Sequence, residues 1–208
     1  MLDLYVKLDA LESTDIPHMV AQRLSSFEQF KQKSSEEWFR ELCFCILTSN
    51  SKAKTAIAIE QQLGADGFLT LPEKLLVKVI RENKHRFHNN KAKYIVEARK
   101  FANIKQILEG MTPQQAREWL VKNIKGFGYK EASHFLRNTG TFHLAVLDRH
   151  IINTMHENKI ISKKPKTLSK KTYLDLEKKF LKISEEFDML PAELDLYMWS
   201  MKTGTVIK

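Results

Sequence analysis

A lysine and an aspartate form the most informative pair of side chains in the sequence. Lys130 follows a glycine-containing turn, and Asp148 comes directly after the apolar run Ala145–Leu147. A lysine just after such a turn commonly contacts phosphate, but most surface lysines have no specific role, and a chemical role needs a partner such as the aspartate. Asp148 also has two interpretations, because aspartate commonly caps a helix and here it can also face the lysine. The pair is more specific than either residue alone.

The turn before Lys130 has the pattern of a helix-hairpin-helix motif. Gly126 and Gly128 flank one apolar residue, Phe127, and join two predicted helices. Glycine permits positive φ and has no Cβ, so backbone N–H groups near the second helix can approach a DNA phosphate closely. Such a contact fixes register on a duplex and reads no bases. We expect Phe127 to fold inward and Lys125 to Gly128 to contact DNA, although this pattern is also common in simple tight turns.

Composition and charge agree with a polyanionic partner. Lys and Arg number 34 against 25 Asp and Glu, which gives a formal net charge of +9, as expected for a protein that binds nucleic acid. Basic residues around Lys91, Arg99 and Lys125 are candidates for contacts with the DNA backbone. The two cysteines are too few for a four-cysteine iron–sulfur cluster or a cysteine-rich zinc site.

Neither a metal site nor a membrane segment is expected from the sequence. His85 and His88 have a helical ligand spacing, but no HExxH or Cys/His framework accompanies them. His134 and His150 are better explained as packing residues around Lys130 and Asp148. No apolar run reaches the roughly 18 residues that a membrane span needs. We expect a soluble intracellular protein, cytoplasmic or nucleoid-associated.

The element pattern is helical throughout. Glycine and proline are sparse, at 7 and 5 residues, and fall between stretches of helical periodicity, whereas sustained alternation of β-branched residues is missing. We therefore predict an all-α fold. The predicted helix starts are Ser34, Ser51, Thr70, Thr112, Ser169 and Pro191. The predicted helix ends are Ser49–Ser51, Gly64, Asn83, Gly126, Asn138–Gly140 and about Phe187.

The sequence is similar to the helix-hairpin-helix DNA glycosylases that have a downstream aspartate, and it closely resembles the archaeal-type 8-oxoguanine DNA glycosylase/lyase family, which also occurs in some bacteria. The resemblance is carried by Lys125–Asn138 and Leu147–His150, with further matches at Glu37–Phe39, Glu41–Thr48, Gly67–Leu69, His85–Phe87 and Leu194–Tyr197. The sequence departs from the broader class in lacking cluster cysteines and in having Lys125 where a proline usually precedes the hairpin glycine.

The resemblance implies a bifunctional base-excision repair enzyme with Lys130 as nucleophile and Asp148 as essential carboxylate. A neutral amine attacks C1′ of the damaged nucleotide, the base leaves, and the resulting Schiff base allows β-elimination and strand cleavage. An ionised aspartate stabilises the oxocarbenium-like sugar in the transition state. No cofactor and no metal are required. The expected partner is double-stranded DNA containing 8-oxoguanine or abasic sites, bound by a monomer.

The resemblance also nominates residues for a flipped-base pocket, because the glycosidic bond is inaccessible inside a duplex. Phe87 and Trp199 are the expected stacking faces, and the end of the chain at Lys208 is expected to contribute its carboxylate nearby. Asn50 is expected to enter the space that the flipped nucleotide vacates. The alternatives are a core tryptophan at position 199 and a helix cap at Asn50.

The implied architecture has two helical lobes with the active site between them. Residues 34–139 form the lobe with the hairpin and Lys130, and residues 1–33 plus 140–208 form the lobe with Asp148. Two other functions stay open at this point. A monofunctional alkylpurine glycosylase would use Asp148 with water and leave Lys130 as a phosphate contact. A non-catalytic DNA-binding module would use the hairpin only to grip phosphates.

Overall fold

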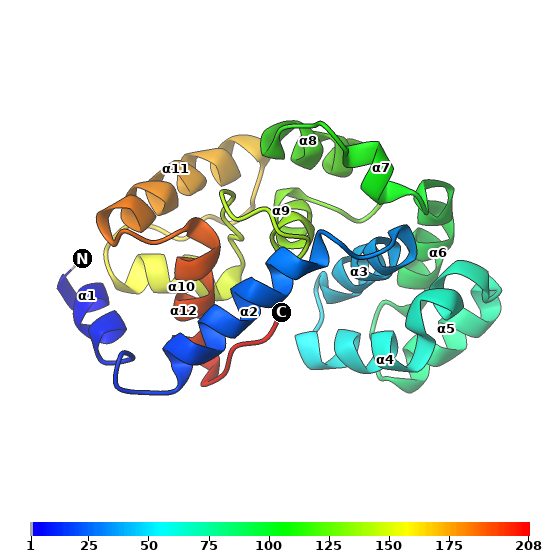
Figure 1. The fold of residues 1–208 in the computed structure, drawn as a ribbon, viewed down its shortest axis with the longest axis horizontal. Coiled ribbons are helices and arrows are strands. Elements are labelled where there is room, and N and C mark those ends of the chain that lie inside the picture. Colours follow the sequence, from blue (N-terminus) through cyan, green and yellow to red (C-terminus); the bar gives the residue numbers. More distant parts are fainter. Residues whose placement is uncertain (1) are drawn as a thin grey trace. The chain divides into compact units, whose positions relative to one another are not determined.

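The computed structural model describes residues 2–208, and within them every regular element is helical (Figure 1). The first helices are α1 (Leu2–Asp9), α2 (Ile16–Phe30), α3 (Ser35–Thr48), α4 (Ala53–Thr70), α5 (Glu73–Glu82) and α6 (His88–Ala98). They are followed by the 3-10 turn η1 (Arg99–Phe101), α7 (Ile104–Leu108), α8 (Pro113–Asn123), α9 (Tyr129–Asn138), α10 (Arg149–Glu157), α11 (Lys170–Glu186) and α12 (Pro191–Thr203). The predicted all-α fold is confirmed. None of the described helices combines the length and apolar character that crossing a membrane requires.

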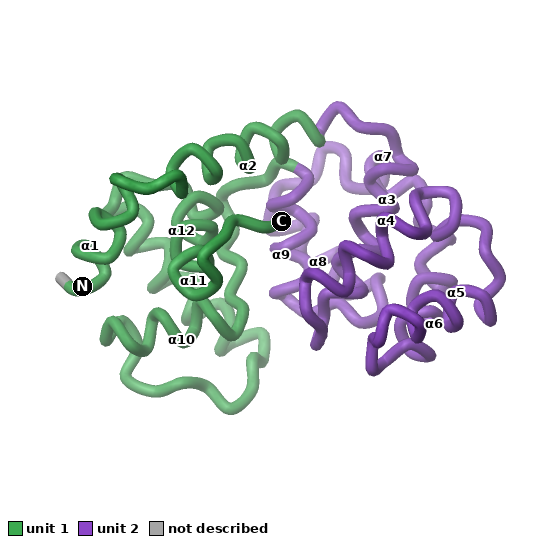
Figure 2. The backbone as a smooth tube through the Cα atoms, turned by 90° about the horizontal axis from the view of Figure 1, so that it is seen from below, with its two compact units in different colours: residues 1–30, 140–208 green, residues 31–139 purple. Residues whose placement is uncertain are grey.

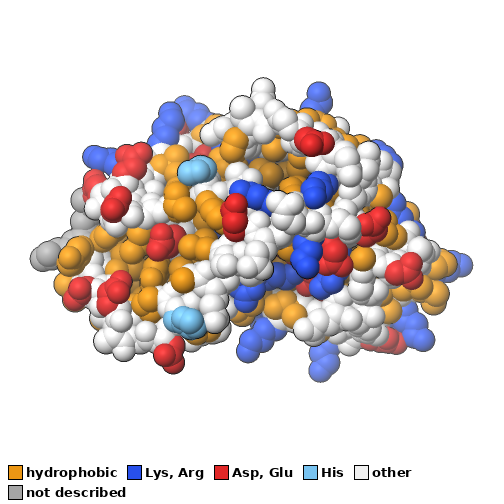
Figure 3. Space-filling model, in the orientation of Figure 1, with side chains coloured by type: hydrophobic (Ala, Val, Ile, Leu, Met, Phe, Trp, Pro, Cys, Tyr) orange, Lys and Arg blue, Asp and Glu red, His pale blue; other side chains and the backbone are white. Residues whose placement is uncertain are grey.

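The helices group into two compact units (Figure 2). Unit 1 contains the chain up to Phe30 together with Gly140–Lys208, and unit 2 contains Lys31–Thr139. The chain therefore leaves unit 1 after α2 and returns to it after α9. Several Lys and Arg side chains lie over unit 2 on the face drawn in Figure 3, interspersed with acidic ones.

Helix α3 is the central helix of unit 2. Every residue from Leu42 to Leu47 is fully buried, because the helix packs against α4, α6, α7 and α9. A helix that is apolar around most of its circumference has no solvent-facing side and must lie inside a core. Helix α9, which carries Lys130, is thus held directly against α3, and α8 packs on α9.

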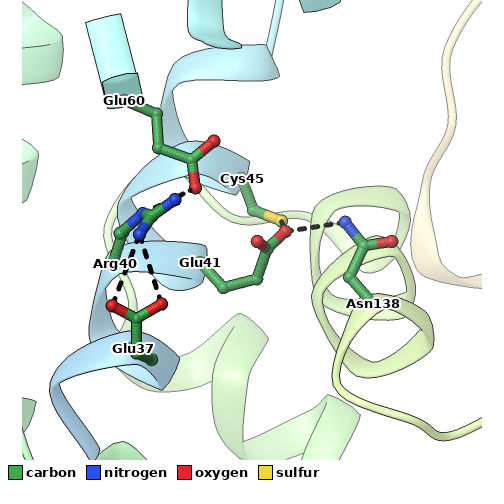
Figure 4. A network of polar contacts seen from close by, with 6 residues as sticks. All are labelled: Glu37, Arg40, Glu41, Cys45, Glu60 and Asn138. Atoms are coloured by element: carbon green, nitrogen blue, oxygen red, sulfur yellow. Dashed lines mark hydrogen bonds and ion pairs between the residues drawn. The ribbon is translucent and has the colours of Figure 1, made fainter. Parts of the chain in front are cut away.

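A buried polar network fixes α9 to α3 (Figure 4). The Asn138 side-chain amide donates to Oε1 of Glu41 at 2.7 Å. The Asn138 side-chain oxygen accepts from Nε and Nη2 of Arg137 at 3.1 and 2.9 Å. All three residues are at most 5% exposed. Breaking such a network by removing one partner is costly, because it leaves a buried charge uncompensated. The network therefore holds the helix that carries Lys130 in a fixed register.

Three predicted N-caps are confirmed by their hydrogen bonds. Ser34 accepts from the backbone N–H of Glu37, and Ser169 caps α11 in the same way. Thr112 and Gln115 form a complete capping box, with bonds of 3.3 Å and 2.9 Å. These caps are local in sequence, so the residue pattern alone identifies them.

Two predicted N-caps are wrong. The residue before α4 is Lys52 rather than Ser51, and it makes no side-chain cap bond. The residue before α5 is Pro72, while Thr70 is the last residue of α4 and donates back into that helix. Gly64, with φ of +60° and ψ of −172°, breaks the helical geometry where expected, but a second helical segment follows at once and runs to Thr70, the position expected to begin the next helix.

Candidate active site

The glycine hairpin joins α8 to α9 in unit 2. Ile124 ends α8, the N–H of Phe127 donates to its carbonyl at 3.2 Å, and Tyr129 begins α9. Phe127 is 8% exposed, so the expected inward packing is confirmed. Gly126 has φ of +87°, a conformation that residues with a Cβ rarely adopt.

The second hairpin glycine has a different role. Gly128 has φ of −108° and ψ of −171°, which is extended backbone that any residue adopts. Its N–H donates to Oε2 of Glu131 at 3.1 Å, which is the one half of a capping box that a residue without a side chain can form. The N–H groups in the first turn of α9 have no carbonyl partner within the helix, so they are candidate donors for a phosphate. A phosphate contact at the hairpin, including Lys125 to Gly128, stays a prediction.

Replacing Gly126 with alanine is expected to lower the melting temperature and weaken duplex binding. A Cβ at this position would meet Cδ2 of Tyr94 at 2.7 Å, in addition to the strain of positive φ. The backbone strain alone costs roughly 1–2 kcal/mol. Gly110→Ala is the matched control, because Gly110 has φ of +75° and open space around its missing Cβ. Thermal unfolding and duplex titration measure both effects, and equal losses in the two variants would contradict the role of the tyrosine contact.

Lys130 lies in the first turn of α9, where its side chain is half-buried. The residue is thus placed by the hairpin at one end of the helix and by the Asn138–Glu41 bond at the other. Within unit 2 its charge acts on a second lysine, Lys91 of α6. An amine in this position is accessible from solvent and lies beside another positive group.

Lys91 and Arg99 donate hydrogen bonds to backbone carbonyls inside unit 2. Lys91 is 5% exposed, and its Nζ donates to the carbonyl of Ile46 at 2.6 Å. Arg99 donates from Nε and Nη2 to the carbonyls of Phe68 and Leu71. Both cations complete the carboxyl ends of other helices, α3 and α4, which is a favourable position for positive charge. Contacts of these two residues with the DNA backbone stay a prediction, and the burial of Lys91 does not favour such a contact there.

Lys125 is the most exposed residue of the predicted basic trio. Its side chain is 56% exposed, and Nζ lies 3.6 Å from Oε2 of Glu97. An exposed ion pair of this kind contributes little to stability. Lys125 is therefore available to a phosphate at small energetic cost.

Burial lowers the pKa of Lys91 to about 8, opposed by the Glu131 carboxylate and reinforced by the charge of Lys130. In the unfolded chain a lysine keeps its proton up to a pKa of about 10.4. Unfolding between these pH values therefore takes up a proton, and stability rises with pH by an amount on the order of 2–3 kcal/mol.

We expect the variant Lys91→Met to lack this rise between about pH 7 and pH 10. Lys93→Met provides the control, because it removes one positive charge from a side chain that is exposed. Urea unfolding at both pH values gives the free energies. A rise of equal size in the wild type and in Lys91→Met would refute the assignment to Lys91.

Asp148 is the N-cap of α10 in unit 1. Its Oδ1 accepts from the backbone N–H of Ile151 at 2.9 Å, so the predicted capping role is confirmed. The side chain is partly exposed, which leaves the second carboxylate oxygen for another interaction. Lys130 belongs to unit 2, and the joint action of the two residues on one sugar stays a prediction.

The extended segment before Asp148 is buried and held by α11. The hydroxyl of Tyr173 donates to the carbonyl of Ala145 at 2.7 Å and accepts from the N–H of Leu147 at 3.2 Å. Oε1 of Glu177 accepts from the N–H of Ala145 at 3.1 Å. Buried backbone groups outside helices need such partners. Two side chains of α11 therefore fix the backbone that leads to the aspartate.

The residues expected to recognise the base lie in both units. In unit 2, Phe87 is 40% exposed, and Asn50 is exposed in a left-handed turn (φ of +59°) directly after α3. In unit 1, Trp199 is half-buried on α12 with its ring edge-to-face against His150, and Lys208 is also half-buried. The turn at Asn50 is the helix-end geometry that the alternative interpretation expected. The base-binding roles of Phe87, Trp199 and Lys208 stay predictions, as does the entry of Asn50 into the space that the flipped nucleotide vacates.

His85 and His88 have hydrogen-bonding roles inside unit 2. Nε2 of His85 lies 2.9 Å from the carbonyl of Leu47, and Nδ1 of His88 lies 3.1 Å from the carbonyl of His85. His134 is 6% exposed, with its ring edge-to-face against Phe44. No hydrogen-bonding role for His85 and His88 was predicted from the sequence, because their spacing raised only the metal site that the lack of a ligand framework argued against. No sequence signal pointed to the contact between His85 and α3.

Helices joined by a glycine hairpin, with a lysine in the first turn that follows and an aspartate capping a later helix, define the class of helix-hairpin-helix DNA glycosylases. A family model described as 8-oxoguanine DNA glycosylase matches residues 20–189. The chain belongs to this family.

Individual relatives resemble the chain over its whole length. It is 48% identical to the 8-oxoguanine DNA glycosylase/AP lyase of Methanocaldococcus jannaschii over 203 residues, which are 97% of this chain and 98% of that protein. A crystal structure of the M. jannaschii 8-oxoguanine glycosylase/lyase in complex with a 15mer DNA containing 8-oxoguanine matches with a TM-score of 0.96 and 47% identity, covering 100% of both chains. The 8-oxoguanine DNA glycosylase of Thermotoga maritima matches with a TM-score of 0.93 and 40% identity, covering 99% of each chain.

Proposed function

We propose that this protein is a bifunctional base-excision repair enzyme that removes 8-oxoguanine from double-stranded DNA and then cleaves the strand at the resulting abasic site. The observation that carries the proposal is the placement of Lys130 in the first turn after the hairpin, in a chain that belongs to the 8-oxoguanine DNA glycosylase family. The amine is half-buried and lies at the start of a helix, where a phosphate can bind as well. A nucleophile that attacks a nucleotide needs such a position.

The reaction uses one lone pair and returns the nucleophile. The neutral amine of Lys130 forms a bond to C1′ as the bond from C1′ to N9 of the base breaks, and the base leaves after taking up a proton. The sugar ring then opens to give an imine. Loss of a 2′ proton and cleavage of the 3′ C–O bond complete β-elimination, and water finally releases the lysine. The proton transfers need groups of suitable pKa close to the sugar.

Asp148 is proposed to stay ionised and to stabilise the positive charge that develops on the sugar. The preceding buried segment supports this role, because a carboxylate on a fixed backbone needs little reorganisation during the reaction. Its helix position leaves one oxygen engaged with the Ile151 N–H, so only the other faces the substrate. We further propose that the protein acts as a monomer, in the cytoplasm or at the nucleoid.

The decisive experiment is borohydride trapping on a duplex with a single 8-oxoguanine. We expect base release, strand cleavage and a covalent enzyme–DNA adduct that appears only with the lesion. Full base release without an adduct would instead indicate a monofunctional glycosylase, and duplex binding without any cleavage would indicate a DNA-binding module. Comparing the four opposite bases in the same assay defines the preferred pair.

A further inference from the structure

The carboxyl end of α3 is completed by side chains from a distant segment. The last four carbonyls of any helix lack partners within the helix. In α3, the carbonyl of Ile46 accepts from Nζ of Lys91, and the carbonyl of Leu47 lies 2.9 Å from Nε2 of His85. The two neighbouring carbonyls are bonded locally. The carbonyl of Cys45 accepts from the hydroxyl of Thr48, and the carbonyl of Thr48 accepts from the N–H of Ser51. The segment from His85 to Lys91 is thus attached to α3 at two points.

His85 connects this helix end to Phe87. The backbone N–H of Phe87 donates to Nδ1 of His85 at 3.1 Å, while the N–H of His85 itself donates to the carbonyl of Ile80 at 3.2 Å. A carbonyl only accepts and an amide N–H only donates, so the ring must carry its proton on Nε2 and a lone pair on Nδ1. The bonds therefore define one tautomer of a neutral ring, which is 2% exposed.

The electrostatic surroundings favour this neutral form. Burial lowers the pKa of His85, the hydrogen bond to the Leu47 carbonyl acts in the opposite direction, and the charges of Lys91, His88 and Arg86 lower it further. Protonation would place a second donor against the Phe87 N–H. The His85–Phe87 bond is consequently retained at neutral pH.

Phe87 exposes a large apolar ring on this fixed backbone. The ring of Phe87 is 40% exposed, although His85 is buried. The Arg86 guanidinium lies 5.3 Å from the ring centroid, and the His85 ring lies 6.4 Å from it in an edge-to-face arrangement. An exposed aromatic face on an immobilised backbone is suited to stacking, because little conformational entropy is lost when a planar group binds.

We propose that His85 is a positioning residue for base recognition, because its neutral ring bridges the end of α3 to the backbone of Phe87. The turn with Asn50 follows the same helix end, so one anchor sets both the stacking ring and the residue expected in the vacated stack. The inference rests on the proposed function and adds a determinant of base excision that does not touch the substrate.

The test compares two activities of the same protein. His85→Phe keeps a ring of similar size and removes both hydrogen bonds, whereas His85→Gln retains one donor and one acceptor. We expect His85→Phe to lower the single-turnover rate of 8-oxoguanine excision by about tenfold. Strand cleavage at a preformed abasic site has no base to stack and is expected to change by less than about twofold. The glutamine variant is expected to recover part of the excision rate.

Controls separate positioning from general loss of folding. Thr112→Ala removes the N-cap of α8 in the same unit, so it weakens folding without affecting the α3 end. This control is expected to leave the ratio of excision to abasic cleavage at the wild-type value. The proposal would be overturned if His85→Phe kept the wild-type ratio of excision to abasic cleavage, whether both activities fell together or neither fell.

The same assays separate failure of this inference from failure of the proposed function. If the wild-type protein neither excises 8-oxoguanine nor cleaves abasic sites, the proposed function is wrong and the positioning role falls with it. If the wild type performs both reactions and His85→Phe keeps the same ratio between them, only the role of His85 is refuted.

Discussion

Replacing Lys130 with glutamine is expected to abolish borohydride trapping and to lower base excision and strand cleavage by roughly 10³-fold or more, the scale of nucleophile deletions in other enzymes. Glutamine keeps a similar length and polarity but has no lone pair that can attack C1′. The variant also removes a positive charge that acts on Lys91, so we expect it to be at least as stable as the wild type. Single-turnover kinetics and denaturing gels measure both reactions.

A neighbouring lysine provides the control. Lys125→Gln removes one charge from the same hairpin, at a side chain that is 56% exposed. It is expected to weaken duplex binding in low salt and to leave the trapped adduct intact, because its contribution to binding is electrostatic. Retention of the adduct in Lys130→Gln would place the nucleophile elsewhere and leave Lys130 as a phosphate contact.

Features encoded by neighbouring residues could be predicted from the sequence. The capping box of Thr112 and Gln115 and the N-cap at Asp148 depend on residues three positions apart. The turn at Gly126 depends on one backbone conformation. Each of these signals is complete within a few residues, so it does not depend on how the chain packs.

Features that depend on tertiary packing were not predicted. Lys91 reaches a carbonyl 45 positions away, and Arg99 reaches one 31 positions away. Both appear in the sequence as exposed basic residues of an amphipathic helix, because their helix-capping partners belong to other helices. Likewise, the bond between Glu41 and Asn138 spans 97 positions, so neither side chain indicates its partner.

The helices at the start of the chain also lacked a sequence signal. In α2, Val20 and Phe27 are the buried residues, which is too sparse an apolar stripe to stand out from the polar residues around it. Its burial is explained by contacts with α12 from the other end of the chain. Such an element becomes recognisable only when the partner helix is known.

Replacing Asp148 with asparagine is expected to lower the excision rate by roughly 10² to 10³-fold, the usual effect of removing one preorganised electrostatic group, while duplex affinity stays within a few fold. Asparagine is among the best N-caps, so it can replace the carboxylate in accepting the Ile151 N–H and the start of α10 should be preserved. Any loss of rate in a folded variant then reports the missing charge. Binding and rate are measured on the same 8-oxoguanine duplex.

A second cap-preserving variant tests whether the charge is responsible. Asp148→Ser retains a capping oxygen without a carboxylate and is expected to lose as much activity as Asp148→Asn, whereas Asp148→Ala should in addition lose about 1 kcal/mol of stability with the cap. If both cap-preserving variants kept the wild-type excision rate, Asp148 would serve only the helix. Equal loss in both, at unchanged melting temperature, would separate the chemical role from the structural one, because both variants keep the cap and neither keeps the charge.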